Sequence, residues 1–304
     1  MGPIIRAEIG DTVEVVLKNM ATKSYSIHPD GLFYKKKYEG SNYQDGTTGD
    51  DKNDNAVAPG VQFKYVWQVP ERAGPTPNED DCLAWAYFSD AHAVTDLYTG
   101  LVGPLLVCKK GTLTEENSRR GVDREFFLLF ATFDENRSWY LDDNINDYCS
   151  DPGPIDELKS DPGFQLSNQN YAINGFLYGN LQGLEMYKGE KVEWYLMGLG
   201  DLTDVHTVHF HGQTFLYKST TMHREDVYDI FPGVYATVEM MPDSVGDWLL
   251  HCHVNNHLAG GMETLFSVME ATNKPTVYST ASKAEFDRII FTTLLVFILF
   301  LLTA

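Results

Sequence analysis

The sequence predicts an all-β protein of two sandwich-sized domains, and three observations support this fold class. The chain has 304 residues, too many for one sandwich domain of about 100–150 residues. Its composition, 43% hydrophobic, 13% aromatic and 22% charged, is typical of a folded globular protein. Short runs of β-forming residues alternate with clusters of Gly, Pro, Asn and Asp, as expected for strands joined by turns.

The clearest strand predictions are runs rich in Val, Ile, Tyr, Phe and Trp. They lie at 12–17, 63–69, 126–133, 191–197 and 237–241. A polar stretch at 109–121 lacks apolar periodicity and is predicted to link the two domains. The predicted division is a first domain at 1–115, a second domain at 121–271, and a stalk with a hydrophobic tail at 272–304.

Similar segments lie near the end of each half of the chain. Residues 100–107 read Gly-Leu-Val-Gly-Pro-Leu-Leu-Val, and residues 260–268 read Gly-Gly-Met-Glu-Thr-Leu-Phe-Ser-Val. This similarity favours a duplicated unit.

The formal net charge of −20 argues against nucleic-acid binding, which needs clustered Lys and Arg, and favours cations as small partners. The loop at 45–55 is especially acidic. It is either a solvated loop or a calcium site, although its spacing is not that of an EF-hand. Of the four cysteines, Cys82 and Cys108 are candidates for one disulfide, whereas Cys149 has no evident partner.

The two ends of the chain suggest an incomplete extracellular protein. Residues 1–3 lead directly into a strand-like run with no signal peptide, so we expect a missing N-terminus. The apolar tail at 289–304 reaches about 24 Å as a helix, short of a hydrocarbon core of roughly 30 Å. This tail is interpreted either as a glycolipid-anchor signal or as a single-pass membrane helix. Asn136 lies in a glycosylation sequon, as expected for an extracellular chain.

Seven of the nine histidines fall between positions 206 and 257, and six of those form two motifs. The first motif is His206-Thr-Val-His209-Phe-His211. The second is His251-Cys252-His253-Val-Asn-Asn-His257-Leu-Ala-Gly-Gly-Met262.

The alternation of side chains along a strand predicts two metal sites. His209 and His211 share one face, as do His251 and His253, while Cys252 points to the other. Two imidazoles, one thiolate and a thioether form a blue-copper centre, so we predict His206, Cys252, His257 and Met262 as its ligands and catalytic residues. Zinc is the alternative metal, but a structural zinc site would be expected to use several cysteines, and Cys252 alone lies near these histidines in the sequence.

These motifs resemble those of the multicopper ferroxidases of the ceruloplasmin and hephaestin family, which are built from six cupredoxin domains. Further matching stretches lie at 32–40, 100–108, 133–141 and 231–233. The resemblance implies domains five and six of such a protein, two cupredoxin-like Greek-key sandwiches with a Cys82–Cys108 disulfide. It also implies that copper is the cofactor.

The resemblance further implies a trinuclear copper cluster in which dioxygen is reduced to water. This chain would supply four of the eight histidine ligands, namely His209, His211, His251 and His253, and the missing N-terminal domains would supply the rest. The corresponding positions in the first half read His28-Pro-Asp30 and Phe88-Ser-Asp90, so that half cannot complete the cluster. We expect His28 and His92 to be structural or exposed.

The iron-binding subsite of the family lies near the blue copper and is lined by carboxylates and a histidine. The matching positions here are Asp143, Tyr148, Leu202 and Asn256, so Asp143 is the one remaining candidate iron ligand. Loss of charge at the other positions should weaken iron binding.

The leading hypothesis is a fragment of a membrane-anchored, extracellular copper oxidase with a role in iron oxidation and transport. Its blue copper would accept single electrons from a donor such as Fe(II) and pass them through Cys252 to the trinuclear cluster. Two alternatives remain, a non-catalytic binding module of the coagulation-cofactor kind and a one-copper electron carrier.

Overall fold

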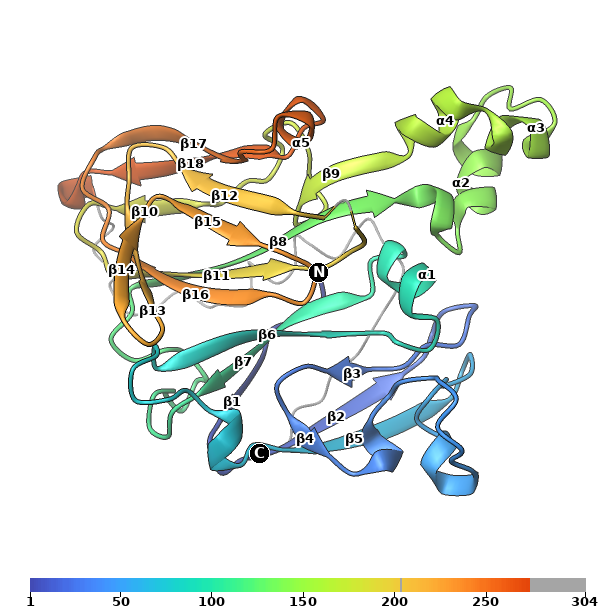
Figure 1. Cartoon of the computed structure of the whole chain (residues 1–304), viewed down its shortest axis with the longest axis horizontal. Coiled ribbons are helices and arrows are strands. Elements are labelled where there is room, and N and C mark those ends of the chain that lie inside the picture. The colour runs from blue at the N-terminus through green and yellow to red at the C-terminus, as the bar shows by residue number, and fades with distance from the viewer. Residues whose placement is uncertain (203, 274–304) are drawn as a thin grey trace.

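The computed structural model describes residues 1–202 and 204–273. Within these residues, strands β1 to β18 form four sheets, joined by short helices and turns (Figure 1). The apolar tail at 289–304 and its predicted membrane anchor lie outside the described residues. No helix in the described part is long and apolar enough to cross a bilayer.

The first half of the chain forms a four-stranded and a three-stranded sheet. The larger sheet has the order β1 (Ile5–Glu8), β7 (Val102–Cys108), β6 (Cys82–Phe88) and β3 (His28–Pro29). The smaller sheet has the order β2 (Thr12–Lys18), β5 (Gln62–Gln68) and β4 (Phe33–Tyr34). Alternate residues of β2 are buried, and its apolar face packs with Tyr65 and Trp67 in one core cluster.

The second half forms a six-stranded and a five-stranded sheet. The first has the order β14 (Met222–Glu225), β13 (Phe215–Lys218), β16 (Tyr235–Met240), β11 (Val192–Gly198), β8 (Arg124–Asp134) and β9 (Gln169–Ile173). The second has the order β10 (Glu185–Tyr187), β18 (Glu263–Met269), β17 (Gly246–Cys252), β12 (His206–Phe210) and β15 (Val227–Ile230). Trp194, Phe210 and Phe266 are fully buried between these two sheets.

The helices are short and occupy the connections. The α-helices are α1 (Ala93–Tyr98), α2 (Leu141–Tyr148), α3 (Ile155–Ser160), α4 (Pro162–Ser167) and α5 (Asn255–Ala259). The 3-10 turns are η1 (Lys36–Tyr38), η2 (Gly49–Lys52), η3 (Glu71–Ala73), η4 (Glu135–Arg137) and η5 (Ala271–Asn273). Helices α2 to α4 project together from one corner of the molecule (Figure 1), whereas α1 and α5 each lie in the loop between two strands.

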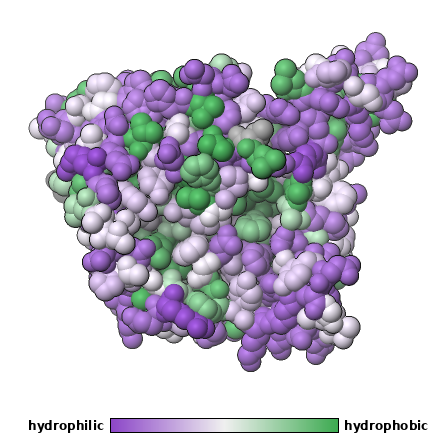
Figure 2. Space-filling view, viewed as in Figure 1, coloured by the Kyte–Doolittle hydropathy of each residue, from purple (hydrophilic) through white to green (hydrophobic). Residues whose placement is uncertain are grey.

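The two halves pack sheet against sheet, with β6 and β7 facing β11 and β16. Every residue of β7 and of β11 is buried, because each strand is covered by its own sandwich on one side and by the other half on the other. Cys82 and Cys108 pair across β6 and β7 and form the predicted disulfide, which is confirmed. The outer surface is mostly polar, with apolar side chains grouped near the middle of the face in Figure 2.

The five strand predictions are confirmed to within two residues, since β2, β5, β8, β11 and β16 occupy those runs. The repeat prediction also has a structural counterpart, because segments 100–107 and 260–268 lead into β7 and β18. The predicted domain limits stay a prediction. The stretch at 109–121 does connect the halves, but its Arg119 is buried between them.

The acidic loop at 45–55 is stabilised by ion pairs. The Asp45 carboxylate forms salt bridges with the ammonium groups of Lys36 at 2.6 Å and Lys52 at 3.0 Å. These contacts, that with Lys36 first, lower the pKa of Asp45. None of the convergent groups of metal-ligating side chains in the described residues lies in this loop. The calcium alternative stays a prediction.

Candidate metal centre

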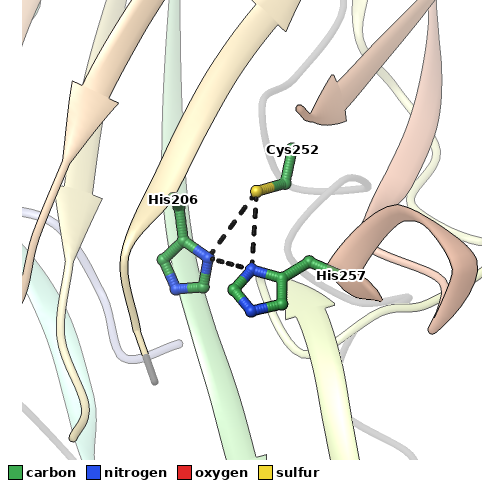
Figure 3. A group of neighbouring side chains, drawn as sticks. All are labelled: His206, Cys252 and His257. Atoms are coloured by element: carbon green, nitrogen blue, oxygen red, sulfur yellow. Dashed lines mark hydrogen bonds between the residues drawn. The ribbon is translucent and has the colours of Figure 1, made fainter. Parts of the chain in front are cut away.

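Three of the four predicted blue-copper ligands converge at one end of the second sandwich (Figure 3). His206 begins β12, Cys252 ends β17, and His257 lies in α5, the helix that follows β17. Because β12 and β17 pair antiparallel with Val208 opposite Cys252, His206 and Cys252 face the same side, toward the core. Helix α5 then turns the chain back, so that His257 reaches the same point.

The donor atoms have the separations that one metal ion requires. The Cys252 Sγ lies 3.9 Å from the His206 Nδ1 and 3.6 Å from the His257 Nδ1, and the two nitrogens are 3.1 Å apart. Metal–sulfur bonds of about 2.3 Å and metal–nitrogen bonds of about 2.0 Å, as found for zinc, place neighbouring donors roughly 3–4 Å apart. The donor set and its spacing therefore fit a single soft metal ion.

The thiol of Cys252 is set up to ionise. Burial would raise its pKa, but hydrogen bonds from His206, His257 and the backbone amides of Thr207 and Val254 lower it to about 6. A thiolate is the form that binds soft metals.

Met262 lies in the same core cluster and is fully buried. Its backbone carbonyl accepts a hydrogen bond from the Cys252 amide at 3.0 Å, and its amide donates to the His257 carbonyl at 2.9 Å. These two hydrogen bonds fix the Met262 backbone beside Cys252 and His257. Its role as the axial ligand stays a prediction.

Two supporting residues were missed by the sequence analysis. Asp204 is fully buried, and its Oδ1 lies 3.1 Å from the His206 Nε2, on the side of the ring away from Cys252. Tyr171 of β9 stacks on the His257 ring, with centroids 4.8 Å apart. The position of Asp204 two residues before His206 was a signal that could have identified it, whereas nothing local points to Tyr171.

A second group of imidazoles lies on the other side of the same strands. The His251 Nε2 is 3.2 Å from the His209 Nδ1 and 3.0 Å from the His211 Nε2. His253 lies just beyond the end of β17, with its ring centroid 5.3 Å from that of His209 and 5.4 Å from that of His251. Burial, followed by the neighbouring imidazoles, lowers the pKa values of His209 and His251, which favours the neutral, metal-binding form.

The two groups occupy opposite faces because side chains alternate along a strand. In β12, His206 is buried and His209 is partly exposed, and His209 lies directly opposite His251 of β17. Cys252 is thus bonded through the backbone to His251 and His253 while its own side chain faces the first group. The structure therefore brings these side chains together as two separate groups, and their roles as copper ligands stay predictions.

The residues at the predicted iron subsite are all exposed. Asp143 lies on an exposed part of α2, Tyr148 is 83% exposed at the end of that helix, and Leu202 is 93% exposed. Asn256 is exposed on α5. Among the described residues, Asp143 belongs to none of the convergent groups of His, Cys, Asp and Glu, so its role as an iron ligand stays a prediction.

The remaining predicted residues have ordinary structural surroundings. The Nδ2 of Asn136 donates to the Asp134 carboxylate at 2.7 Å and to the Gln165 carbonyl at 2.8 Å, and its glycosylation stays a prediction. His28 pairs opposite Phe88, and its Nδ1 contacts the Glu39 carbonyl at 2.7 Å. His92 packs edge-on against Trp139, and Cys149 is a free thiol.

Sequence models of two multicopper oxidase domains match residues 1–112 and 157–272 of the chain. Hephaestin of Rattus norvegicus is 47% identical over 287 residues, which cover 94% of this chain and 24% of that protein. Ceruloplasmin of Homo sapiens is 47% identical over 270 residues, which cover 89% of this chain and 24% of that protein. The chain therefore spans about a quarter of the length of these relatives.

Solved structures show the same fold at lower identity. The multicopper oxidase mgLAC has a TM-score of 0.63 at 19% identity, covering 93% of this chain and 81% of that one. A blue copper oxidase from Nitrosomonas europaea has a TM-score of 0.59 at 22% identity, covering 91% and 79%. The predicted pair of cupredoxin-like sandwiches is confirmed.

Proposed function

The chain belongs to the multicopper oxidase family, and we propose from this premise that it is the electron-accepting part of a copper-dependent oxidase of the ferroxidase kind. The observation that carries the proposal is the convergence of the Cys252 thiol with the imidazoles of His206 and His257, with Met262 buried beside them. Two imidazoles, one thiolate and a weak thioether form the donor set of a blue-copper centre.

Each residue of this centre has a distinct role in the proposal. His206 and His257 present their Nδ1 atoms, and Cys252 presents its Sγ. Asp204 holds the far nitrogen of His206 and so fixes the ring orientation and leaves Nδ1 free to bind. Copper, when bound here, supplies a one-electron acceptor.

The backbone joins this centre to the second group of imidazoles. His251 and His253 flank Cys252 directly in the sequence, and His209 and His211 lie across from them on β12 and just beyond its end. We infer that these four histidines are this chain's share of a trinuclear copper cluster that reduces dioxygen to water. The other ligands come from a part of the protein that this chain does not contain.

The proposed electron donor is Fe(II), and the proposed location is the extracellular face of a membrane. Support comes from the 45% identity over 269 residues to a human protein named ferroxidase HEPHL1, covering 88% of this chain and 23% of that protein. His206 is fully buried and His257 is 6% exposed, so a donor reaches neither ring directly. Electrons therefore enter through a residue that packs on the rings and is itself partly exposed, and Tyr171, stacked on His257, meets both conditions.

The experiment is an anaerobic titration of the copper-loaded chain with Fe(II), followed by the visible thiolate-to-copper absorption. We expect bleaching with one electron per blue copper, and no catalytic oxygen uptake on return to air, because half of the cluster ligands are missing. A chain loaded with zinc is the control and should stay colourless. An absorption band that excess Fe(II) leaves intact while dithionite bleaches it would refute Fe(II) as the donor, and a band that neither bleaches would refute the redox site.

A further inference from the structure

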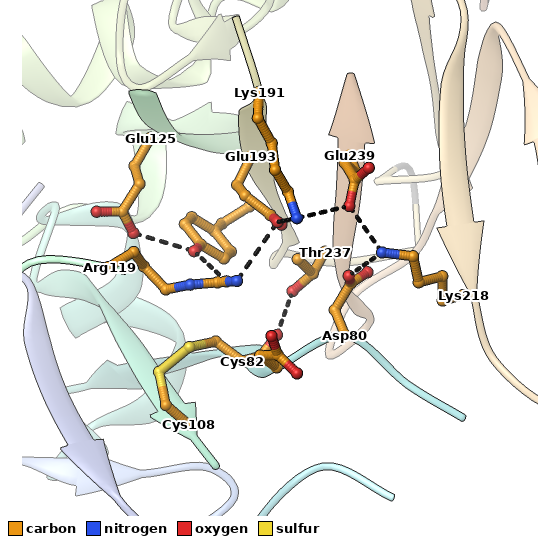
Figure 4. Close-up of polar contacts among 12 residues, drawn as sticks. Asp80, Cys82, Cys108, Arg119, Glu125, Lys191, Glu193, Lys218, Thr237 and Glu239 are labelled. Atoms are coloured by element: carbon orange, nitrogen blue, oxygen red, sulfur yellow. Dashed lines mark hydrogen bonds and ion pairs between the residues drawn. A yellow bond between two sulfur atoms is a disulfide. The ribbon is translucent and has the colours of Figure 1, made fainter. Parts of the chain in front are cut away.

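A second set of buried charges, separate from the two histidine groups, lies between the two sandwiches (Figure 4). Asp80 precedes β6 in the first sandwich, while Glu193 of β11 and Glu239 of β16 belong to the second. Each of the three residues places one carboxylate oxygen in the cluster, and these three oxygens all lie within 4.8 Å of one another. Glu193 is fully buried and Asp80 is 5% exposed, so this is an acidic cluster shielded from solvent.

Three cations bind the acids of this cluster. The Lys218 Nζ donates to the Asp80 Oδ1 and to the Glu239 Oε2, both at 2.7 Å. The Lys191 Nζ lies 3.0 Å from the Glu239 Oε2, and the Arg119 Nη2 donates to the Glu193 Oε1 at 3.4 Å. The three acids are therefore balanced by three cations.

Further charged and polar groups enclose the cluster from the side of Arg119. The Arg119 Nη1 donates to the Tyr195 hydroxyl at 3.1 Å, and that hydroxyl donates to the Glu125 Oε1 at 3.0 Å. Glu125 is paired in turn with Arg6, whose Nη1 contacts both carboxylate oxygens at 2.8 Å. This pair is neutral in sum and adds no net charge.

Two buried oxygens of the cluster have no donor among the described residues. They are the Asp80 Oδ2 and the Glu193 Oε2, one from each sandwich. Leaving a buried carboxylate oxygen without a hydrogen bond destabilises the folded state. A divalent cation would add two charges to a set that is already balanced, whereas a proton adds only one and turns one of the acids into a hydrogen-bond donor.

We propose that Asp80 and Glu193 jointly hold one proton across the interface, and that this proton strengthens the packing of the two sandwiches. The proton makes one carboxyl a neutral group in a dry interface, and its O–H becomes available as the missing donor. Release of the proton leaves the Asp80 Oδ2 and the Glu193 Oε2 as buried carboxylate oxygens without a donor in the described part of the chain, and packing weakens.

The ionisation behaviour of the cluster agrees with this arrangement. Burial, together with the charges of Asp80 and Glu239, raises the pKa of Glu193 to about 7 despite Arg119. Burial likewise raises the pKa of Asp80. Since the folded protein holds this proton more tightly than the unfolded chain, stability is highest below about pH 4.5 for this group and falls as the pH rises toward about 7.

The test compares urea unfolding of the metal-free chain of 304 residues and its Glu193→Gln variant between about pH 5 and pH 8. Glutamine is neutral at every pH and stands for the protonated form. We expect the unfolding midpoint of the wild type to fall across this range, and the fall to be much smaller in Glu193→Gln. In Asp80→Asn the unfolding midpoint should fall at lower pH than in the wild type, because the negative charge that raises the pKa of Glu193 is removed.

Glu125→Gln is the matched control, since it removes another carboxylate of the same interface whose oxygens are both paired with Arg6. It should lower the midpoint by a similar amount at all pH values. Parallel pH profiles for the wild type and Glu193→Gln would overturn the proposal.

A second measurement does not depend on how well a variant folds. The infrared spectrum of the wild type should show the carbonyl stretch of a protonated carboxyl at about pH 6, which disappears as the pH rises. Absence of that band would also overturn the proposal. Both experiments use metal-free protein, so their outcome is separate from that of the copper proposal.

Discussion

The loop that holds the proposed copper ligands in the second sandwich has a counterpart in the first sandwich with matching backbone hydrogen bonds and different side chains. Both are strand–helix–strand units, β17–α5–β18 and β6–α1–β7. The Cys252 amide bonds to the Met262 carbonyl at 3.0 Å, and the Ser89 amide bonds to the Leu101 carbonyl at 3.1 Å.

A second pair of backbone bonds matches in the same way. The Met262 amide bonds to the His257 carbonyl at 2.9 Å, and the Leu101 amide bonds to the Asp96 carbonyl at 3.3 Å. Ser89, Asp96 and Leu101 thus occupy the places that Cys252, His257 and Met262 have in the second sandwich.

In the first loop, buried side chains hydrogen-bond to one another at the position where the second loop has its proposed metal ligands. The fully buried Asp96 accepts bonds from the Ser89 hydroxyl at 2.6 Å and from the Trp139 Nε1 at 2.8 Å. Trp139 comes from the second sandwich, so the first loop serves as a docking point between the halves. The difference teaches that the cupredoxin-like scaffold does not by itself specify a metal site, and that a few side chains decide between binding a metal and joining domains.

The largest expected effect comes from making the second loop resemble the first at one position. Cys252→Ser should abolish the intense visible absorption of the copper-loaded chain, because a hydroxyl cannot replace the thiolate donor. The readout is the absorption spectrum together with copper per chain after dialysis. Cys149→Ser is the matched control and should keep the band. A band of full intensity in Cys252→Ser would contradict the ligand assignment.

Asp204→Asn should have an intermediate effect. The exchange removes the charge that holds the His206 ring, and loss of such a partner lowers metal affinity by about 10–100-fold. Competition with a copper chelator measures this affinity. Asp229→Asn makes the same change at an exposed position on the neighbouring β15 and should leave affinity near that of the wild type. Equal losses in the two variants would show that Asp204 acts through overall charge.

The smallest expected effect concerns the docking role of the first loop. Trp139→Phe leaves the buried Asp96 Oδ1 without its donor and should cost about 1–3 kcal/mol of unfolding free energy, with copper affinity unchanged. Tyr140→Phe, the control, removes a bond at the same interface between neutral hydroxyls of Tyr140 and Tyr25, and should cost less. A smaller loss for Trp139→Phe than for Tyr140→Phe would argue against Asp96 as the docking point.

The sequence predicts the parts of this molecule that depend on local periodicity. Strand positions follow from short β-forming runs, and the two-site geometry follows from the alternation of His251, Cys252 and His253 along one strand. The spacing of His257 after Cys252 is likewise local, because a single helical turn brings it back to the thiol.

The parts that the sequence does not predict depend on burial and on contacts between distant segments. Glu193 occurs in a strand-like run, but only the packing of the first sandwich on β11 removes it from water. Trp139 meets Asp96 from 43 residues away and from the other sandwich. Exposure of Leu202 and Tyr148 also becomes visible only once the loops are placed.

The most direct test of the central claim is a copper titration of the metal-free chain, followed by visible absorption and by metal content. The proposed centre of His206, Cys252, His257 and Met262 predicts an intense thiolate-to-copper band that arises from one bound copper per chain. Copper that binds without this band, or a band to which more than one copper per chain contributes, would contradict the blue-copper assignment.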